Sequence, residues 1–233
     1  MSDDRPVLIV GAGGLGAPSA LILARSGVRL RLVDDDRVDI TNLQRQILFT
    51  RDDLGEKKVD AAKARLLEAG SPAVEAIDAR VVPENAAEFF AGVSLVLDGT
   101  DNYATKFMLF DYARAAGVPI VSAGAVRLSG WTMASFPQGG PCLRCVFEDL
   151  PAGPTATCAE AGVVGPVVGL IGALQASLAL RILSGQENEV RGRLLRYEGL
   201  SGSIRRSSPL PRKGCSSCAD PATYLSTRGY APN

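Results

Sequence analysis

A glycine-rich turn between an apolar run and a helical stretch constrains the fold of this chain more than any other feature. The run VLIV at residues 7–10 is typical of a strand buried on both faces, and GAGGLG follows it at residues 11–16. A helical stretch to about residue 26 comes next, and LRLV at residues 30–33 predicts a second strand. Strand, turn, helix and strand within ~30 residues are typical of a βαβ unit with parallel strands.

Strands and helices keep alternating further along the chain. We expect strands at residues 74–82, 94–98 and 118–124, and helices at residues 57–69 and 103–116. This alternation predicts an α/β fold with a doubly wound, Rossmann-like and mostly parallel sheet.

The pattern changes after residue 129. WTMASF at residues 131–136 predicts a strand, residues 165–184 a helix, and residues 193–207 a late hairpin. We therefore expect a C-terminal antiparallel extension of the sheet. Residues 221–233 show no clear core pattern, so we expect them to be loosely held.

The glycine turn also predicts a nucleotide site. Its pattern, GxGxxG, lets backbone N–H groups approach a phosphate at the start of a helix. The glycines concerned are Gly11, Gly13, Gly14 and Gly16. Asp34 ends the second predicted strand and is placed to accept hydrogen bonds from a ribose hydroxyl, whereas Asp35 and Asp36 are more typical of solvated loop acids.

Polar and cationic side chains follow this turn. Asn42 and Arg45 lie in TNLQRQ, and Lys58 stands at the start of the helix predicted over residues 57–69. A triphosphate that is being cleaved needs cations on its oxygens, whereas a dinucleotide needs fewer. By residue type alone these are also ordinary surface charges, so NAD, FAD and ATP all stay open as ligands.

Four of the five cysteines form two CxxC pairs, CLRC and CSSC. The four thiols are Cys142, Cys145, Cys215 and Cys218. Four thiolates surround one Zn²⁺ tetrahedrally and leave no open position for catalysis, so we expect a structural zinc site that clips the tail onto the fold. Unrelated buried or redox-active cysteines are the alternative.

The composition excludes several classes of function. The chain has no histidine, which excludes Ser-His-Asp triads and His-ligated zinc catalysis. Equal numbers of Lys+Arg and Asp+Glu, 25 each, argue against nucleic-acid or anionic-membrane partners. The apolar residues 163–180 include Pro166 and Gln175, so we expect a buried helix there rather than a membrane span. The acidic start MSDDR lacks the layout of a secretory signal, and we expect a cytoplasmic protein.

Five features follow one another along the chain: GAGGLG, Asp34, NLQRQ, the Lys58 segment and LDGTDN. In this order they make the chain resemble the MoeB/ThiF family over residues 7–218. These are bacterial relatives of ubiquitin-activating enzymes. The resemblance implies one adenylation domain over residues 1–233, with a nucleotide-binding core to residue 136 and a zinc- and carrier-binding region over residues 137–233. It implies an ATP-dependent adenylyltransferase that converts the C-terminal glycine of a small ubiquitin-like sulfur carrier (MoaD/ThiS-like) to an acyl-adenylate, releasing pyrophosphate. The carrier would serve molybdopterin, thiamine or thiolated tRNA synthesis.

The resemblance also implies residue roles. Gly13 belongs to the phosphate loop, and the phosphate contacts are Asn42, Arg45 and Lys58. Asp101 holds Mg²⁺ with Asn102 beside it, and zinc is bound at the four paired cysteines. In this family the cysteine that matches Cys158 forms a covalent link to the carrier in some members and is dispensable for adenylation in others.

Two departures from the family leave alternatives open. The first strand is predicted at residue 7, so we expect the chain to lack the helical segment that in the family carries an arginine into the neighbouring subunit's site. This expectation allows a non-catalytic nucleotide-binding subunit of the same fold. We expect no rhodanese-like extension and therefore a separate sulfur donor, together with a homodimer. Two further hypotheses remain. One is an enzyme that adenylates a carboxyl on modified tRNA, and the other is an NAD- or FAD-dependent oxidoreductase.

Overall fold

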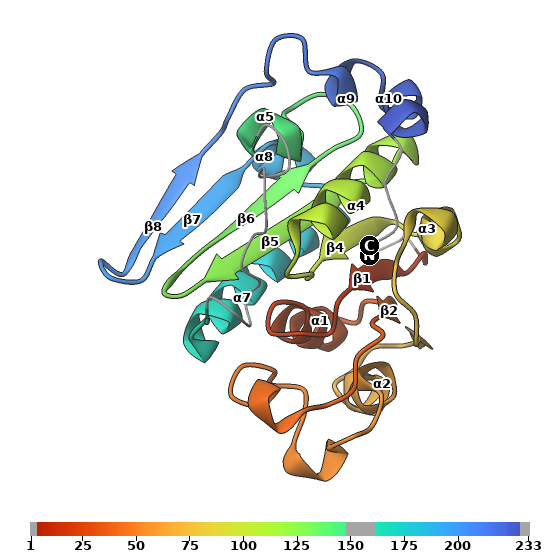
Figure 1. Ribbon diagram of the computed structural model, residues 1–233, viewed down its shortest axis with the longest axis vertical. Helices are drawn as coiled ribbons and strands as arrows, with labels where there is room; N and C mark the ends of the chain where they lie inside the picture. Colours follow the sequence, from red (N-terminus) through yellow and green to blue (C-terminus); the bar gives the residue numbers. More distant parts are fainter. Residues whose placement is uncertain (1–3, 148–161, 229–233) are drawn as a thin grey trace.

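The computed structural model describes residues 4–147 and 162–228. One sheet of eight strands runs through these residues in the order β3-β2-β1-β4-β5-β6-β7-β8 (Figure 1). The strands are β1 (Val7–Val10), β2 (Leu30–Val33), β3 (Val74–Ile77), β4 (Leu95–Asp98), β5 (Ile120–Val126), β6 (Ser129–Ser135), β7 (Leu194–Glu198) and β8 (Ser203–Ser207).

The first five strands pair in parallel, and β6, β7 and β8 continue the same sheet with antiparallel pairing. The predicted α/β class, with a mostly parallel sheet and an antiparallel C-terminal extension, is therefore confirmed. The sheet runs on without a break past residue 136, and the functional division at that position stays a prediction.

Helices cover both faces of the parallel strands (Figure 1). They are α1 (Gly16–Arg25), α2 (Lys58–Glu68), α3 (Pro83–Phe90), α4 (Tyr103–Ala115) and α7 (Gly165–Leu183). Side chains of β1 alternate between two cores: Val7 and Ile9 pack with α1, α2 and α7, whereas Leu8 and Val10 pack with α3 and α4. Burial on both faces explains why this strand is a continuous apolar run.

Short helices connect these elements and complete the C-terminal part. They are η1 (Ile40–Asn42), η2 (Arg51–Asp53), α5 (Leu143–Phe147), α8 (Glu187–Val190), α9 (Ser216–Ala219) and α10 (Pro221–Arg228).

The structure corrects two expectations about local elements. The strand predicted over residues 74–82 ends at Ile77, and the sequence pattern missed helix α3, which begins at Pro83. Proline suits the first turn of a helix because the N–H that it lacks would have no partner there. Part of the tail expected to be loosely held forms α10, which packs against α4.

Helix α7 is the buried helix expected over residues 165–184. It is long and apolar enough to cross a membrane, yet it packs against α1 and strands β4 to β6. A Cβ on Gly172 would lie 2.5 Å from Cγ of Pro18, which shows how closely α7 approaches α1. Ser19 Oγ donates to Gln175 Oε1 at 2.9 Å, so a buried hydrogen bond joins the two helices.

The turn between β1 and α1 requires glycine at two positions. Gly11 has a φ of 93°, in the left-handed region that favours glycine. A Cβ on Gly16 would stand 1.7 Å from the Gly11 carbonyl oxygen, so no other residue fits at the start of α1. A Cβ on Gly99 would lie 2.9 Å from the Gly16 nitrogen, so the turn after β4 rests directly on the first turn of α1.

Candidate functional site

A cavity of about 410 Å³ opens at the carboxyl ends of β1, β2 and β4. The chain leaves β1 toward β2 on one side and reaches β4 on the other, so this is the point where the strand order reverses. Ligands of doubly wound sheets bind at such a crevice. The predicted nucleotide contacts that line it are Gly11, Gly13, Gly14, Asp34, Asn42, Arg45, Lys58, Asp101 and Asn102.

Gly16 is the one predicted nucleotide contact that does not line this cavity. It is buried beneath the turn, where its missing side chain lets α1 begin against Gly11 and Gly99. The glycine pattern places Gly16 in the turn, where this glycine serves the packing of the turn and lies outside the lining of the cavity.

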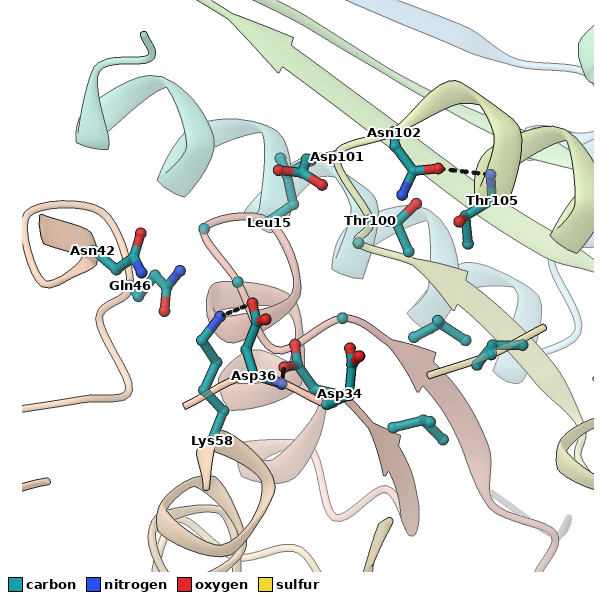
Figure 2. A pocket seen from close by; sticks show the side chains of 18 of the residues that line it. Leu15, Asp34, Asp36, Asn42, Gln46, Lys58, Thr100, Asp101, Asn102 and Thr105 are labelled. Carbon is teal, nitrogen blue, oxygen red and sulfur yellow. Dashed lines mark hydrogen bonds and ion pairs between the residues drawn. The ribbon is translucent and has the colours of Figure 1, made fainter. Parts of the chain in front are cut away.

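Asp34 is held in a fixed orientation at the end of β2. Its Oδ2 accepts a hydrogen bond from the Ala12 backbone N–H at 2.6 Å, and its Oδ1 accepts one from the Asp36 N–H at 2.9 Å. Burial raises the pKa of Asp34, and the Lys58 ammonium and the Ala12 hydrogen bond oppose the rise. The carboxylate is therefore an oriented acceptor at the edge of the cavity (Figure 2).

Two cationic side chains reach the cavity from the segment after β2. Lys58 begins α2, its side chain is 3% exposed, and its Nζ lies 2.7 Å from Oδ2 of Asp36 (Figure 2). Arg45 follows η1 and donates to Asn42 Oδ1 at 2.5 Å and to the Thr41 carbonyl at 3.1 Å. The Asp36 side chain is 67% exposed, so water can solvate it when the ammonium turns toward an anion.

The opposite wall comes from the turn between β4 and α4 (Figure 2). Asn102 caps α4, because its Oδ1 accepts the Thr105 N–H at 2.8 Å. Asp101 is exposed, and within residues 4–147 and 162–228 its carboxylate has no hydrogen-bond or ion-pair partner. A carboxylate with free oxygens facing a phosphate-sized cavity suits Mg²⁺, which takes one or two carboxylates and keeps several waters.

Gln46 is a cavity residue that the sequence reasoning missed. The residue is 4% exposed, and its Oε1 has no hydrogen-bond partner among the described residues. Figure 2 shows it beside Asn42. A buried amide oxygen without a donor is unfavourable in the free protein, which points to a ligand group that completes it. Glutamine is usually a surface residue, and only its burial distinguishes this one.

Replacing Gln46 with leucine should weaken ATP binding and leave the fold intact. One lost hydrogen bond of ~1 kcal/mol corresponds to about a fivefold rise in Kd. The thermal midpoint should stay unchanged or rise slightly, because the substitution removes an unpaired buried group. Isothermal titration calorimetry with ATP measures the first effect, and scanning calorimetry the second. An unchanged Kd would show that Gln46 does not contact the nucleotide.

The four paired cysteines meet in one cluster, as predicted. Their Sγ atoms lie 3.7 Å apart between Cys142 and Cys145, 3.6 Å between Cys142 and Cys215, and 3.5 Å between Cys145 and Cys218. Zinc–sulfur bonds of ~2.3 Å in a tetrahedron separate the sulfurs by ~3.8 Å. The Arg212 backbone N–H points at Cys145 Sγ from 3.2 Å, a contact that supports a thiolate. These four residues could hold a metal ion.

The two cysteine loops are also tied to α4. The Arg144 guanidinium lies 2.8 Å from Asp111 Oδ2, and Ser217 Oγ donates to Asp111 Oδ1 at 2.9 Å. Arg144 and Ser217 stand between the cysteines of their respective CxxC pairs. The cluster therefore fastens the C-terminal segment to the body of the fold. Cys158, the fifth cysteine, lies outside the described residues.

A second cavity of about 300 Å³ shares Thr100 and Asp101 with the first. Trp131 and Phe147 contribute aromatic surface to it, with ring centroids 4.9 Å apart, and Arg196 contributes a cation from β7. The Asp101 carboxylate thus stands at the boundary between the two cavities.

Comparison with known proteins gives a consistent result. The ThiF family profile matches residues 3–218. The sulfur carrier protein adenylyltransferase of Thermus thermophilus is 38% identical over 234 residues, covering 96% of this chain and 86% of that protein.

Two further similarities differ in what they establish. The adenylyltransferase and sulfurtransferase MOCS3 of Aedes aegypti is 39% identical over 219 residues and 92% of this chain, and the chain spans 50% of that longer protein's length. The E. coli MccB structure with ATP matches with a TM-score of 0.81, covering 93% of this chain and 68% of that one. At 22% identity, the second similarity establishes a shared fold alone.

Proposed function

The chain belongs to the ThiF family, and on that premise we propose that it is an ATP-dependent adenylyltransferase acting on the C-terminal carboxylate of a ubiquitin-like sulfur carrier. The observation that carries the proposal is the convergence of Asp34, Arg45, Lys58 and Asp101 on one cavity above the glycine turn. The names of the Thermus and Aedes relatives support the same reaction.

The backbone of the glycine turn would hold the nucleotide's phosphates. The start of α1 presents unpaired N–H groups and the positive end of the helix dipole, both of which favour an anion. Gly13 and Gly14 line the cavity without side chains that would block this approach. Asp34, already oriented by two backbone N–H groups, would accept the ribose hydroxyl.

Arg45 and Lys58 would neutralise the triphosphate. A carboxylate and a phosphate are both anions and repel each other. Attack at the α-phosphorus therefore needs positive groups that offset this repulsion and stabilise the negative charge on the departing pyrophosphate. Mg²⁺ held by Asp101 would add a divalent charge beside the phosphates. The fit rests on the free oxygens of Asp101 and its place in the wall of the cavity.

The carrier's terminal carboxylate would enter through the second cavity, because that cavity meets the first at Thr100 and Asp101. Such a carboxyl has a pKa of ~3.3–3.7 and is ionised at neutral pH, so the attack requires no general base. A chain without histidine can therefore carry out this reaction.

A structural Zn²⁺ at the four-cysteine cluster completes the proposal. The sulfur separations fit tetrahedral coordination, and four protein ligands leave no position for a substrate.

Pyrophosphate exchange tests the activity. The purified protein is mixed with Mg²⁺-ATP, labelled pyrophosphate and, one at a time, carriers ending in Gly-Gly from molybdopterin, thiamine and tRNA thiolation systems. We expect label to enter ATP with one carrier and not with the same carrier lacking its last glycine. No exchange with any carrier, despite ATP binding, would favour the non-catalytic nucleotide-binding subunit instead.

The same assay separates Cys158 from the first step. Because the nucleophile in adenylation is the carrier's carboxylate, Cys158→Ala should leave pyrophosphate exchange within about twofold of wild type. Any loss should appear only when later sulfur transfer is measured. A large loss of exchange would contradict the carboxylate mechanism.

A further inference from the structure

A buried ion pair lies beneath the wall that separates the two cavities. Asp98, the last residue of β4, is fully buried, and the Lys106 side chain on α4 is 5% exposed. Lys106 Nζ lies 3.1 Å from Asp98 Oδ2 and donates to the Ala123 carbonyl at 2.5 Å. Two buried charges are tolerated only when pairing and hydrogen bonds satisfy them, as they do here.

Asp98 uses its remaining capacity to hold the turn that follows it. Its Oδ1 accepts the Thr100 backbone N–H at 3.0 Å and the Thr100 hydroxyl at 2.7 Å, and its Oδ2 accepts the Ser122 hydroxyl. All these neighbours are donors, which matches an ionised carboxylate with a cation beside it. Asn102 fixes the other end of the turn as the cap of α4. Asp101 lies between these two anchors.

We propose that Lys106 is a positioning residue: through Asp98 and Thr100 it sets where the Asp101 carboxylate stands. The inference rests on the proposed function in one respect, namely that Asp101 receives Mg²⁺ with ATP. Without the Lys106 ammonium, Asp98 would have no cationic partner among the described residues, and the carboxylate that accepts from the turn carrying Asp101 would no longer be held in place. Lys106 also lines the second cavity, so this pair supports the point where the nucleotide and the acceptor would meet.

The test compares Lys106→Met and Lys106→Arg with a matched control, Asp111→Asn. Asp111 is a buried carboxylate on the same helix, paired with Arg144, and it lines neither cavity. ATP binding is titrated calorimetrically in EDTA and over a series of Mg²⁺ concentrations, alongside the thermal midpoint. Thr100→Val, which removes only the hydroxyl's hydrogen bond to Asp98, serves if Lys106→Met does not fold.

We expect the Lys106→Met variant to bind ATP in EDTA with the wild-type affinity. The Mg²⁺ concentration at which Mg²⁺ changes ATP binding should be about tenfold higher than in the wild type, and pyrophosphate exchange should be about 10²-fold slower. Lys106→Arg should recover most of both losses. Asp111→Asn should lower the thermal midpoint and leave the Mg²⁺ requirement unchanged.

Two results would overturn the proposal. The first is that Lys106→Met folds and needs the same Mg²⁺ concentration for ATP binding as the wild type does. If Lys106→Met does not fold, the same result in folded Thr100→Val would count. The other is the absence of any Mg²⁺ effect on ATP binding by the wild-type chain. The Mg²⁺ titration needs no carrier, so absence of exchange in the wild-type chain counts against the proposed function and leaves this measurement intact.

Discussion

Arg45→Ala and Lys58→Ala should each reduce pyrophosphate exchange by about 10²- to 10³-fold, the usual effect of removing one preorganised charge from a reacting site. Both side chains line the nucleotide cavity, and no other Lys or Arg of the described residues lines it except Arg80. When either cation is removed, the repulsion between the carrier's carboxylate and the triphosphate is less well neutralised, so the attack is slower.

Neither substitution should unfold the protein. Lys58→Ala leaves Asp36 unpaired, but that carboxylate is 67% exposed and water solvates it. Arg45→Ala removes donors to Asn42 and to the Thr41 carbonyl, both partly open to solvent.

Lys57→Ala is the matched control for these variants. Lys57 precedes Lys58 in the chain, is paired with Asp78 at 2.8 Å, and does not line the cavity. Its loss removes the same charge and should change exchange by less than twofold. Exchange at wild-type rates in both Arg45→Ala and Lys58→Ala would refute the assignment of these residues as phosphate contacts. An equal loss of exchange in Lys57→Ala would show that the loss follows from the change in net charge and not from contact with the phosphates.

Cys215→Ser should remove the metal and strongly destabilise the fold. Structural zinc in zinc-finger peptides supplies ~10–16 kcal/mol of apparent folding free energy, and a chain of this size loses ~2–4 °C of thermal midpoint per kcal/mol. Cys215 is buried at the start of α9, so the loss would also release the segment fastened through Ser217 to Asp111. We expect a fall of more than ~10 °C.

Elemental analysis and scanning calorimetry measure this prediction together. The wild-type chain should hold one zinc per molecule, and Cys215→Ser well under half of that. Cys158→Ser, at the fifth cysteine, is the control and should keep its zinc. Full zinc content in Cys215→Ser would show that this thiol is not a ligand.

Sequence patterns correctly predicted the elements that are determined by residues close together in the chain. The run VLIV is buried on both faces, and glycine at positions 11 and 16 is required by a left-handed φ and by a close backbone contact. Helix α3 was missed although its buried residues, Ala86, Phe89 and Phe90, have helical spacing. The helix has only eight residues, too few for this spacing to stand out without its packing against α4.

The candidate site was predictable in part. Residue types near the glycine turn, supported by the family resemblance, identified Asp34, Arg45 and Lys58, and the structure gathers them in one cavity. Gln46 carries no charge and stands out only by its burial and by an Oε1 that has no partner in the described part of the chain. The pairing of Asp98 with Lys106 also escaped prediction, because sequence spacing does not reveal that both side chains turn inward together.

A crystal of the protein soaked with Mg²⁺-ATP tests the central claim most directly. We expect the triphosphate on the turn formed by residues 11–14, with Arg45 and Lys58 within hydrogen-bond distance of its oxygens and Asp101 beside the Mg²⁺. A triphosphate lying away from these three side chains would contradict the account.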